Sequence, residues 1–163
     1  MRSGRFRPTL LLTILVLCSL PSNAQESSYI LFGGGSFNIS GSQDAAQLDI
    51  EWRSTPKAWK LQINAGGMVT SDNAAYVFGG LRRDLRAGEN WGISLGFGVG
   101  LWETGDGLDL GGLVEFRSSI ELFAEVTDRS RLGLMFYHLS HAGIYEENPG
   151  SNSLVLLYGR RLK

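Results

Sequence analysis

The sequence predicts an all-β protein, an eight-stranded antiparallel β-barrel that spans an outer membrane. Three observations indicate this fold class. After residue 24, apolar and polar residues alternate with period two through most of the chain, which is typical of strands with two different faces. An export signal precedes this region. No later segment approaches the roughly 18 consecutive apolar residues that a transmembrane helix needs.

The first residues have the pattern of a secretory signal peptide. Three arginines precede an apolar stretch at 10–20, and a short segment of small residues ends at Ala24. That stretch is too short to span a bilayer as a helix, so we expect cleavage after Ala24. The predicted organisation is a signal peptide at 1–24 and one barrel domain at 25–163.

The composition of the mature chain excludes several classes of protein. The single cysteine, Cys18, lies in the signal peptide, so no disulfide holds the fold. Beyond residue 24 the chain has 12 basic and 16 acidic residues. This mild acidity argues against nucleic acid as a partner.

Eight alternating segments are the expected strands. They lie at about 28–40, 46–54, 58–71, 74–86, 91–103, 112–127, 130–141 and 152–162. Tight turns alternate with longer connections along the chain, apart from a short link at 71–73. An even number of strands with short turns at one end and longer loops at the other is typical of outer-membrane barrels.

The character of the two faces favours a membrane barrel over a soluble sandwich or lipocalin. A soluble barrel would bury the apolar face, whereas a membrane barrel turns it toward lipid. The segment at 91–103 has glycine on its polar face, which suits a narrow interior. Acidic residues at 115–125 are expected to pair inside with Arg53, Lys60, Arg82 or Arg86. An aromatic girdle is expected from Trp52, Trp59, Trp91, Trp102 and Tyr158.

The seventh segment carries the candidate catalytic pair. Its apolar, lipid-directed face includes His138 and Ser140, which are separated by Leu139 on the other face. Side chains at i and i+2 of a strand lie about 7 Å apart, so the histidine can reach the serine hydroxyl. A serine beside a histidine base is the minimum for acyl transfer. The alternative is an interfacial polar pair without a catalytic role.

The residues from His138 to Gly143, followed by Asn148-Pro-Gly150-Ser-Asn152, resemble the signature of the PagL lipid A 3-O-deacylases. The resemblance implies an eight-stranded outer-membrane barrel with a Ser-His-Glu triad on its lipid-facing surface. In that family the pattern is His-x-Ser-Asn-Ala-Gly, and the acid lies at the start of the eighth strand. The resemblance assigns His138 as the general base and Ser140 as the nucleophile, without a metal or cofactor.

Two positions depart from the family pattern. His141 replaces the asparagine that helps to stabilise the oxyanion, and its alternation points it away from Ser140. The expected oxyanion hole therefore comprises His141, Ala142 and Gly143, with the last two amides as the stronger candidates. The position of the family glutamate is occupied here by Asn152. We expect the seventh and eighth strands to pair with Ser140 opposite Asn152, which would leave Asn152 diagonal to His138.

Three interpretations of the missing acid stay open. Asn152 orients His138 through its amide, or Glu147 (or Glu146) folds back as a substitute acid, or the site has lapsed. An amide can hold the histidine tautomer but cannot stabilise an imidazolium by charge.

The predicted function is an esterase that hydrolyses the 3-hydroxyacyl chain at position 3 of lipid A, in the outer membrane of a Gram-negative bacterium. The alternative is a non-catalytic structural or adhesion barrel of the OmpX type. The expected partners are lipopolysaccharide, the outer membrane and the barrel assembly machinery. The sequence leaves open whether the barrel is a monomer or a homodimer.

Overall fold

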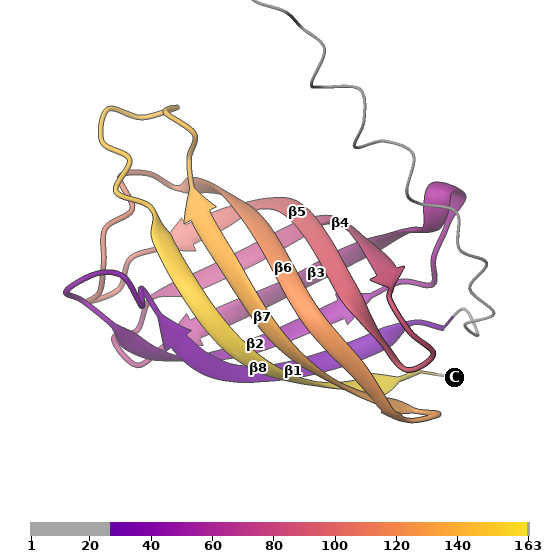
Figure 1. Ribbon diagram of the computed structural model, residues 1–163. Coiled ribbons are helices and arrows are strands. Elements are labelled where there is room, and N and C mark those ends of the chain that lie inside the picture. Colours follow the sequence, from indigo (N-terminus) through magenta and orange to yellow (C-terminus); the bar gives the residue numbers. More distant parts are fainter. Residues whose placement is uncertain (1–26, 163) are drawn as a thin grey trace, which may run out of the picture.

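A computed structural model describes residues 27–162 and shows a closed barrel of eight antiparallel strands in sequence order (Figure 1). The strands are β1 (Tyr29–Phe37), β2 (Ala45–Arg53), β3 (Leu61–Thr70), β4 (Ala75–Arg86), β5 (Trp91–Glu103), β6 (Val114–Thr127), β7 (Ser130–Ser140) and β8 (Ser151–Arg161). Because β8 pairs with β1, the sheet has no exposed edge. The predicted fold class and number of strands are confirmed, while the signal peptide predicted at 1–24 lies outside the described residues.

β1 and β3 are each four residues shorter than the sequence predicts, for a local backbone reason. β1 ends at Phe37 because Asn38 takes a φ of 57° and begins a turn, in which the Gly41 N–H donates to the Asn38 carbonyl over 2.9 Å. β3 begins at Leu61 because a 3-10 turn, η1 (Ala58–Lys60), precedes it. No helix in the described range is long and apolar enough to cross a membrane.

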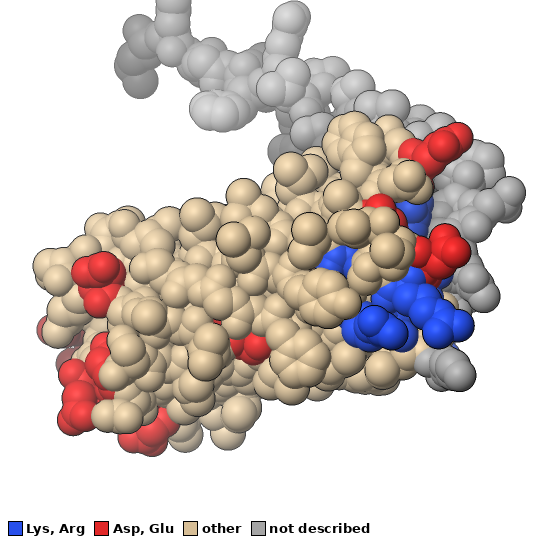
Figure 2. Space-filling model, turned by 90° about the horizontal axis from the view of Figure 1, so that it is seen from below, with Lys and Arg blue, Asp and Glu red and all other residues tan. Residues whose placement is uncertain are grey.

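The two ends of the barrel differ. The loop end carries the connections at 38–44, 71–74, 104–113 and 141–150, and the turn end carries those at 54–60, 87–90 and 128–129. Residue 27 and the end of β8 both lie at the turn end (Figure 1). In Figure 2, acidic side chains gather at the loop end, basic side chains with some acidic ones gather at the turn end, and the band between them is nearly uncharged.

The outward face of the strands is apolar. Leu48 is 65 % exposed, Phe97 60 % and Leu156 68 %, in positions that alternate with buried neighbours. Large exposed apolar surfaces are rare on soluble monomers, whereas a membrane barrel needs an apolar band on its outside. The structure thus has the faces expected of a membrane barrel rather than those of a lipocalin.

A network of charged side chains fills the turn-end half of the interior. The Glu121 carboxylate contacts Arg53 at 2.7 Å, Arg82 at 3.1 Å and Arg131 at 2.9 Å. Glu51 lies within 3.6 Å of both Arg82 and Arg117. Closely spaced opposite charges of this kind offset the cost of removing each ion from water.

Only some of the ion pairs predicted for the barrel interior form in the structure. Glu121 does pair with Arg53 and Arg82, and Glu125 pairs with Arg86 at 3.1 Å. Lys60 does not take part, because it lies exposed in η1 at the barrel end. Glu115 forms no ion pair within residues 27–162, although its side chain is buried.

The glycine face of β5 leaves room for these interior side chains. A Cβ atom added at Gly96 would lie 2.8 Å from Nη1 of Arg82, and one added at Gly100 would lie 2.6 Å from the Tyr76 ring. The expectation that glycine lines a narrow interior is therefore confirmed.

The predicted aromatic girdle needs one correction. Trp52, Trp59, Trp91 and Tyr158 are all exposed, and all four lie toward the turn end. Trp102 is only 3 % exposed and stacks inside on Phe37, with ring centroids 5.2 Å apart. Trp102 continues the inward-facing alternation of the glycines in β5, so the period of the strand places it in the interior.

Replacing one interior carboxylate is expected to destabilise the barrel strongly. Glu121→Gln would leave three buried arginines without their shared counter-charge, a loss of about 3–5 kcal/mol in the free energy of unfolding. The matched control is Glu125→Gln, whose partners Arg86 and Arg161 are 21 % and 14 % exposed. We expect a smaller loss from this substitution, because these side chains keep some access to water at the turn end of the barrel. Urea unfolding of the refolded barrel, followed by tryptophan fluorescence, measures both, and equal losses would contradict the prediction.

Candidate active site

The loop end of β7 presents two polar side chains on the outward, apolar face. His138 and Ser140 are partly exposed, whereas Tyr137 and Leu139 point inward and are fully buried. Their outward neighbours along the strand, Leu134 and Phe136, are apolar and exposed. The alternation thus places both predicted residues on the outer surface, as expected from the sequence.

Pairing of the strands forms a polar row across this apolar face. His138 lies opposite Ser118 on β6 and opposite Asn152 on β8. This register differs by two residues from the one expected, in which Ser140 lay opposite Asn152. A shift of two residues keeps every side chain on its predicted face. It changes the position of Asn152 from diagonal to directly opposite His138.

A hydrogen bond joins the histidine to the asparagine. The distance from His138 Nδ1 to Asn152 Oδ1 is 2.9 Å, and Asn152 Nδ2 donates to Ser40 Oγ over 2.8 Å. An amide oxygen only accepts, so this geometry requires the proton on Nδ1 of His138. Nε2 then keeps its lone pair and is available as a base.

The space beside the imidazole depends on a glycine. A Cβ atom added at Gly150 would lie 3.0 Å from Cε1 and 3.4 Å from Nε2 of His138. Gly150 also has a φ of +62°, which strains other residues. The glycine of the Asn-Pro-Gly segment therefore lets the loop pass close to the His138 imidazole.

Ser140 is bordered by apolar side chains on β6 and β5. It lies opposite Phe116, whose ring stacks on Phe97 with centroids 5.9 Å apart. Within the described residues its hydroxyl forms no hydrogen bond with His138. The serine is thus an outward hydroxyl on an apolar surface, two positions from a histidine on the same face.

The structure does not bring the His141 side chain to Ser140. Its ring is fully buried, Nε2 donates to the Glu147 carbonyl, and Nδ1 accepts the Tyr145 N–H over 3.3 Å. Its own N–H donates to Asn148 Oδ1 over 3.2 Å. Because every N–H of His141 is used within the loop, this residue organises the loop at 141–150 and cannot also bind an oxyanion.

The next two residues leave amide groups free. Ala142 and Gly143 have φ values of 54° and 80°, and their N–H groups have no hydrogen-bond acceptor in the described range. A positive φ is uncommon for alanine and is held by the turn in which Ile144 N–H donates to the His141 carbonyl over 3.1 Å. Free N–H groups two and three residues after the candidate nucleophile Ser140 suit an oxyanion hole.

The acidic residues of the same loop lie apart from His138. Glu146 and Glu147 have exposed side chains, and Glu147 contributes its backbone carbonyl to His141. Neither carboxylate forms a hydrogen bond or ion pair with His138 among residues 27–162. Of the candidates for the third position, Asn152 is the one that the structure places against the histidine.

Two residues with hydroxyl groups near His138 were not predicted from the sequence. Ser118 interrupts an otherwise apolar outward face between Phe116 and Ile120, a signal that the alternation contained. Ser40 belongs to a loop more than 100 positions away from Asn152, and no local pattern indicates it. No group of three or more potential metal ligands occurs in the described part of the chain.

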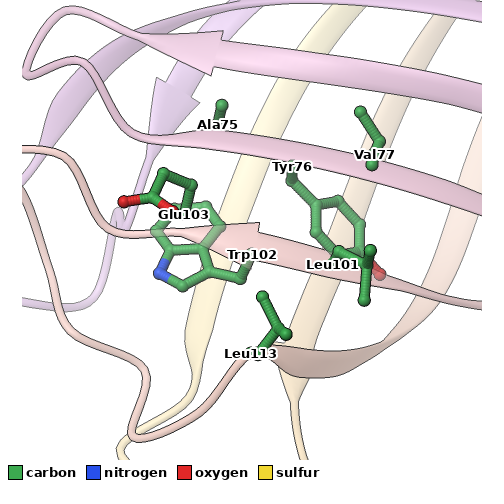
Figure 3. Close-up of a pocket in the computed structure, with 7 residues that line it drawn as sticks. All are labelled: Ala75, Tyr76, Val77, Leu101, Trp102, Glu103 and Leu113. Carbon is green, nitrogen blue, oxygen red and sulfur yellow. The ribbon is translucent and has the colours of Figure 1, made fainter.

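A shallow apolar groove lies elsewhere at the loop end. Its lining comes from β4, from β5 and from the residue before β6, and includes Val77, Leu101 and Leu113 (Figure 3). None of the predicted site residues line it. The His138 row lies on β6, β7 and β8, whereas the groove lies mainly on β4 and β5, so the groove does not form part of the candidate active site.

Comparisons with known proteins show the family and the fold of the chain. The family model of the lipid A 3-O-deacylase PagL matches residues 34–161. The crystal structure of the outer-membrane enzyme PagL is similar, with a TM-score of 0.65, 20 % identity, and coverage of 82 % of this chain and 99 % of that one. Neisserial surface protein A is similar in fold, with a TM-score of 0.65, 11 % identity, and coverage of 83 % and 97 %. A comparison with curated protein sequences finds no match.

Proposed function

Because the chain belongs to the PagL family of lipid A 3-O-deacylases, we propose that it is a serine esterase that removes the 3-hydroxyacyl chain from position 3 of lipid A. It is an outer-membrane β-barrel of that family. The loop end would face the cell exterior, so that Ser140 and His138 lie at the depth of the outer leaflet. Ester bonds of lipid A lie between the sugar head group and the acyl chains, at this depth.

The observation that carries the proposal is the hydrogen bond from His138 Nδ1 to Asn152 Oδ1, at 2.9 Å. It leaves Nε2 as a base on the same outward face as Ser140. A structural barrel has no use for a serine, a histidine and an asparagine on a surface directed toward lipid, where unpaired polar groups cost free energy.

The reaction proceeds by two acyl transfers. Ser140 Oγ attacks the ester carbonyl carbon while His138 Nε2 takes the hydroxyl proton, and the amides of Ala142 and Gly143 stabilise the oxyanion. His138 then passes this proton to the sugar oxygen, and the C–O bond breaks. Water attacks the acyl-enzyme with His138 as base, which releases the fatty acid and restores the serine. The complete reaction consumes only water.

The surroundings of Ser140 suit a lipid substrate. Phe116 and Phe97 beside the serine provide an apolar surface continuous with the outward band, along which acyl chains can lie. The substrate reaches the site from the membrane rather than from water. Insertion of such a barrel requires the assembly machinery of the outer membrane, and either a monomer or a homodimer leaves this mechanism unchanged.

One observation favours the alternative of a barrel without catalytic activity. Asn152 carries no charge, so it cannot stabilise the imidazolium that forms during each acyl transfer as a carboxylate would. A lapsed site in a structural or adhesion barrel would keep the fold and lose the reaction.

Mass spectrometry of lipid A from cells that express the chain tests the proposal. Loss of one 3-hydroxyacyl mass from position 3, absent from cells with the empty vector, is the expected result. Heat-modifiable migration of the barrel on a gel establishes that it is folded in the outer membrane. Unchanged lipid A beside a folded barrel would contradict the proposal and support the structural alternative.

A further inference from the structure

The loop that follows β1 reaches the candidate site across the seam that closes the barrel. Ile39 N–H donates to the backbone carbonyl of Asn152 over 2.9 Å, and the turn from Asn38 to Gly41 is held by its own hydrogen bond of 2.9 Å. Asn38 Nδ2 also donates to the Gln43 carbonyl over 3.1 Å. The loop is therefore fixed to β8 at the residue that contacts His138.

This anchoring delivers Ser40 to the side-chain amide of Asn152. Asn152 Nδ2 donates to Ser40 Oγ over 2.8 Å, while Oδ1 lies 2.9 Å from His138 Nδ1. The amide has two chemically different ends. With its oxygen toward His138, Nε2 of the imidazole is a base. With its NH₂ group toward His138, Nδ1 would accept and Nε2 would carry the proton, and the histidine could not deprotonate Ser140.

We propose that Ser40 is a positioning residue for the deacylation, an inference that rests on the proposed function. Its hydroxyl accepts the amide N–H of Asn152 and so holds the Asn152 side chain in the position that contacts His138. The same bond polarises the amide and makes its oxygen a stronger acceptor, since hydrogen bonds in a chain reinforce one another. A carboxylate would hold its contact with His138 by its charge, because charge-assisted hydrogen bonds are stronger than neutral ones. An uncharged asparagine depends more on a second hydrogen bond.

Nitrogen-15 NMR of the histidine rings tests the positioning without any reference to activity. The chain has only two histidines, and the structure gives them opposite tautomers. In detergent-refolded, histidine-labelled protein we expect His138 with its proton on Nδ1 and His141 with its proton on Nε2. Ser40→Ala should shift the ring signals of His138 toward a tautomer mixture and leave those of His141 unchanged. Signals of His138 that do not respond to Ser40→Ala would overturn the inference.

Kinetics of lipid A deacylation in mixed micelles provide the second readout. Loss of one neutral hydrogen bond corresponds to roughly a three- to tenfold decrease in kcat for Ser40→Ala, with KM unchanged. Ser40→Thr should restore the rate. Ser42→Ala is the matched control, since the Ser42 hydroxyl in the same loop has no hydrogen-bond partner within residues 27–162, and should have no effect.

The decisive comparison uses an Asn152→Asp background, in which Ser40→Ala should change kcat less than twofold, because the charge of the aspartate keeps its hydrogen bond to His138 without the serine. An undiminished effect of Ser40→Ala in that background would show that Ser40 acts by another route and overturn the inference. If the unmodified chain does not deacylate lipid A, the proposed function fails, and the NMR result alone decides whether Ser40 positions Asn152.

Discussion

Ser140→Ala is expected to abolish removal of the 3-linked acyl chain, with kcat falling by about 10⁴-fold or more. In serine hydrolases the nucleophile, the base and the orienting residue act as a unit, so loss of the nucleophile removes most of the rate enhancement. The substitution deletes one hydroxyl from a partly exposed position on the outer surface of β7. It therefore should not alter the stability of the barrel.

The matched control is Ser118→Ala, which deletes a hydroxyl from the same outward face, directly across from His138. Lipid A is isolated from cells that contain equal amounts of each folded variant, and the fraction without the 3-hydroxyacyl chain is measured by mass spectrometry. We expect full deacylation with Ser118→Ala and none with Ser140→Ala. The reverse result would identify Ser118 as the nucleophile. Activity in both variants would show that neither serine is the nucleophile.

Asn152→Asp is expected to raise kcat at least tenfold, with about 10⁴ as the upper limit. That limit is the cost of exchanging the acid for its amide in a Ser-His-Asp protease. Aspartate has the shape of asparagine, so an oxygen stays close to the 2.9 Å that separates Asn152 Oδ1 from His138 Nδ1. The new charge would stabilise the imidazolium that forms in both acyl transfers.

Two further variants distinguish charge from shape in this experiment. Asn152→Leu keeps a similar volume without a polar group and should lower kcat, because the histidine loses its tautomer constraint. Glu147→Gln should leave kcat unchanged, because the Glu147 carboxylate makes no contact with His138 in the described residues. If Asn152→Asp is no faster than the native chain while Glu147→Gln is inactive, the substitute acid is Glu147 and the role of Asn152 is structural.

Under the proposed mechanism, the two loops beside the site compensate for the two departures from the family pattern. His141 has been recruited to hold its own loop, through the Glu147 carbonyl and the Tyr145 N–H. That loop leaves the N–H groups of Ala142 and Gly143 free, so an oxyanion hole does not need a side chain at position 141. Asn152 in turn is held by a second loop. In the proposed mechanism, backbone N–H groups and a neighbouring hydroxyl would take over tasks of the two missing side chains.

The sequence by itself determined the fold class, the number of strands and the face on which each strand residue lies. Period-two alternation is a local property, since neighbouring side chains of a strand point to opposite sides whatever the strand pairs with. For this reason His138 and Ser140 could be placed on the outward face, and the glycines of β5 inside. The same alternation places Trp102 in the interior, although it was predicted to belong to the aromatic girdle. That prediction was wrong because it considered the position of Trp102 near a strand end and not the face on which the residue lies.

Only the tertiary structure decided which side chains meet. The register of β7 and β8 places Asn152 directly opposite His138, and closure of β1 on β8 brings Ser40 to Asn152. The same closure sets Arg53, Arg82 and Arg131 around Glu121. Register depends on the hydrogen bonds of the whole ladder and on the length and turns of the loops. A shift by two residues preserves every face while exchanging every partner, so alternation alone cannot specify the contacts of the site.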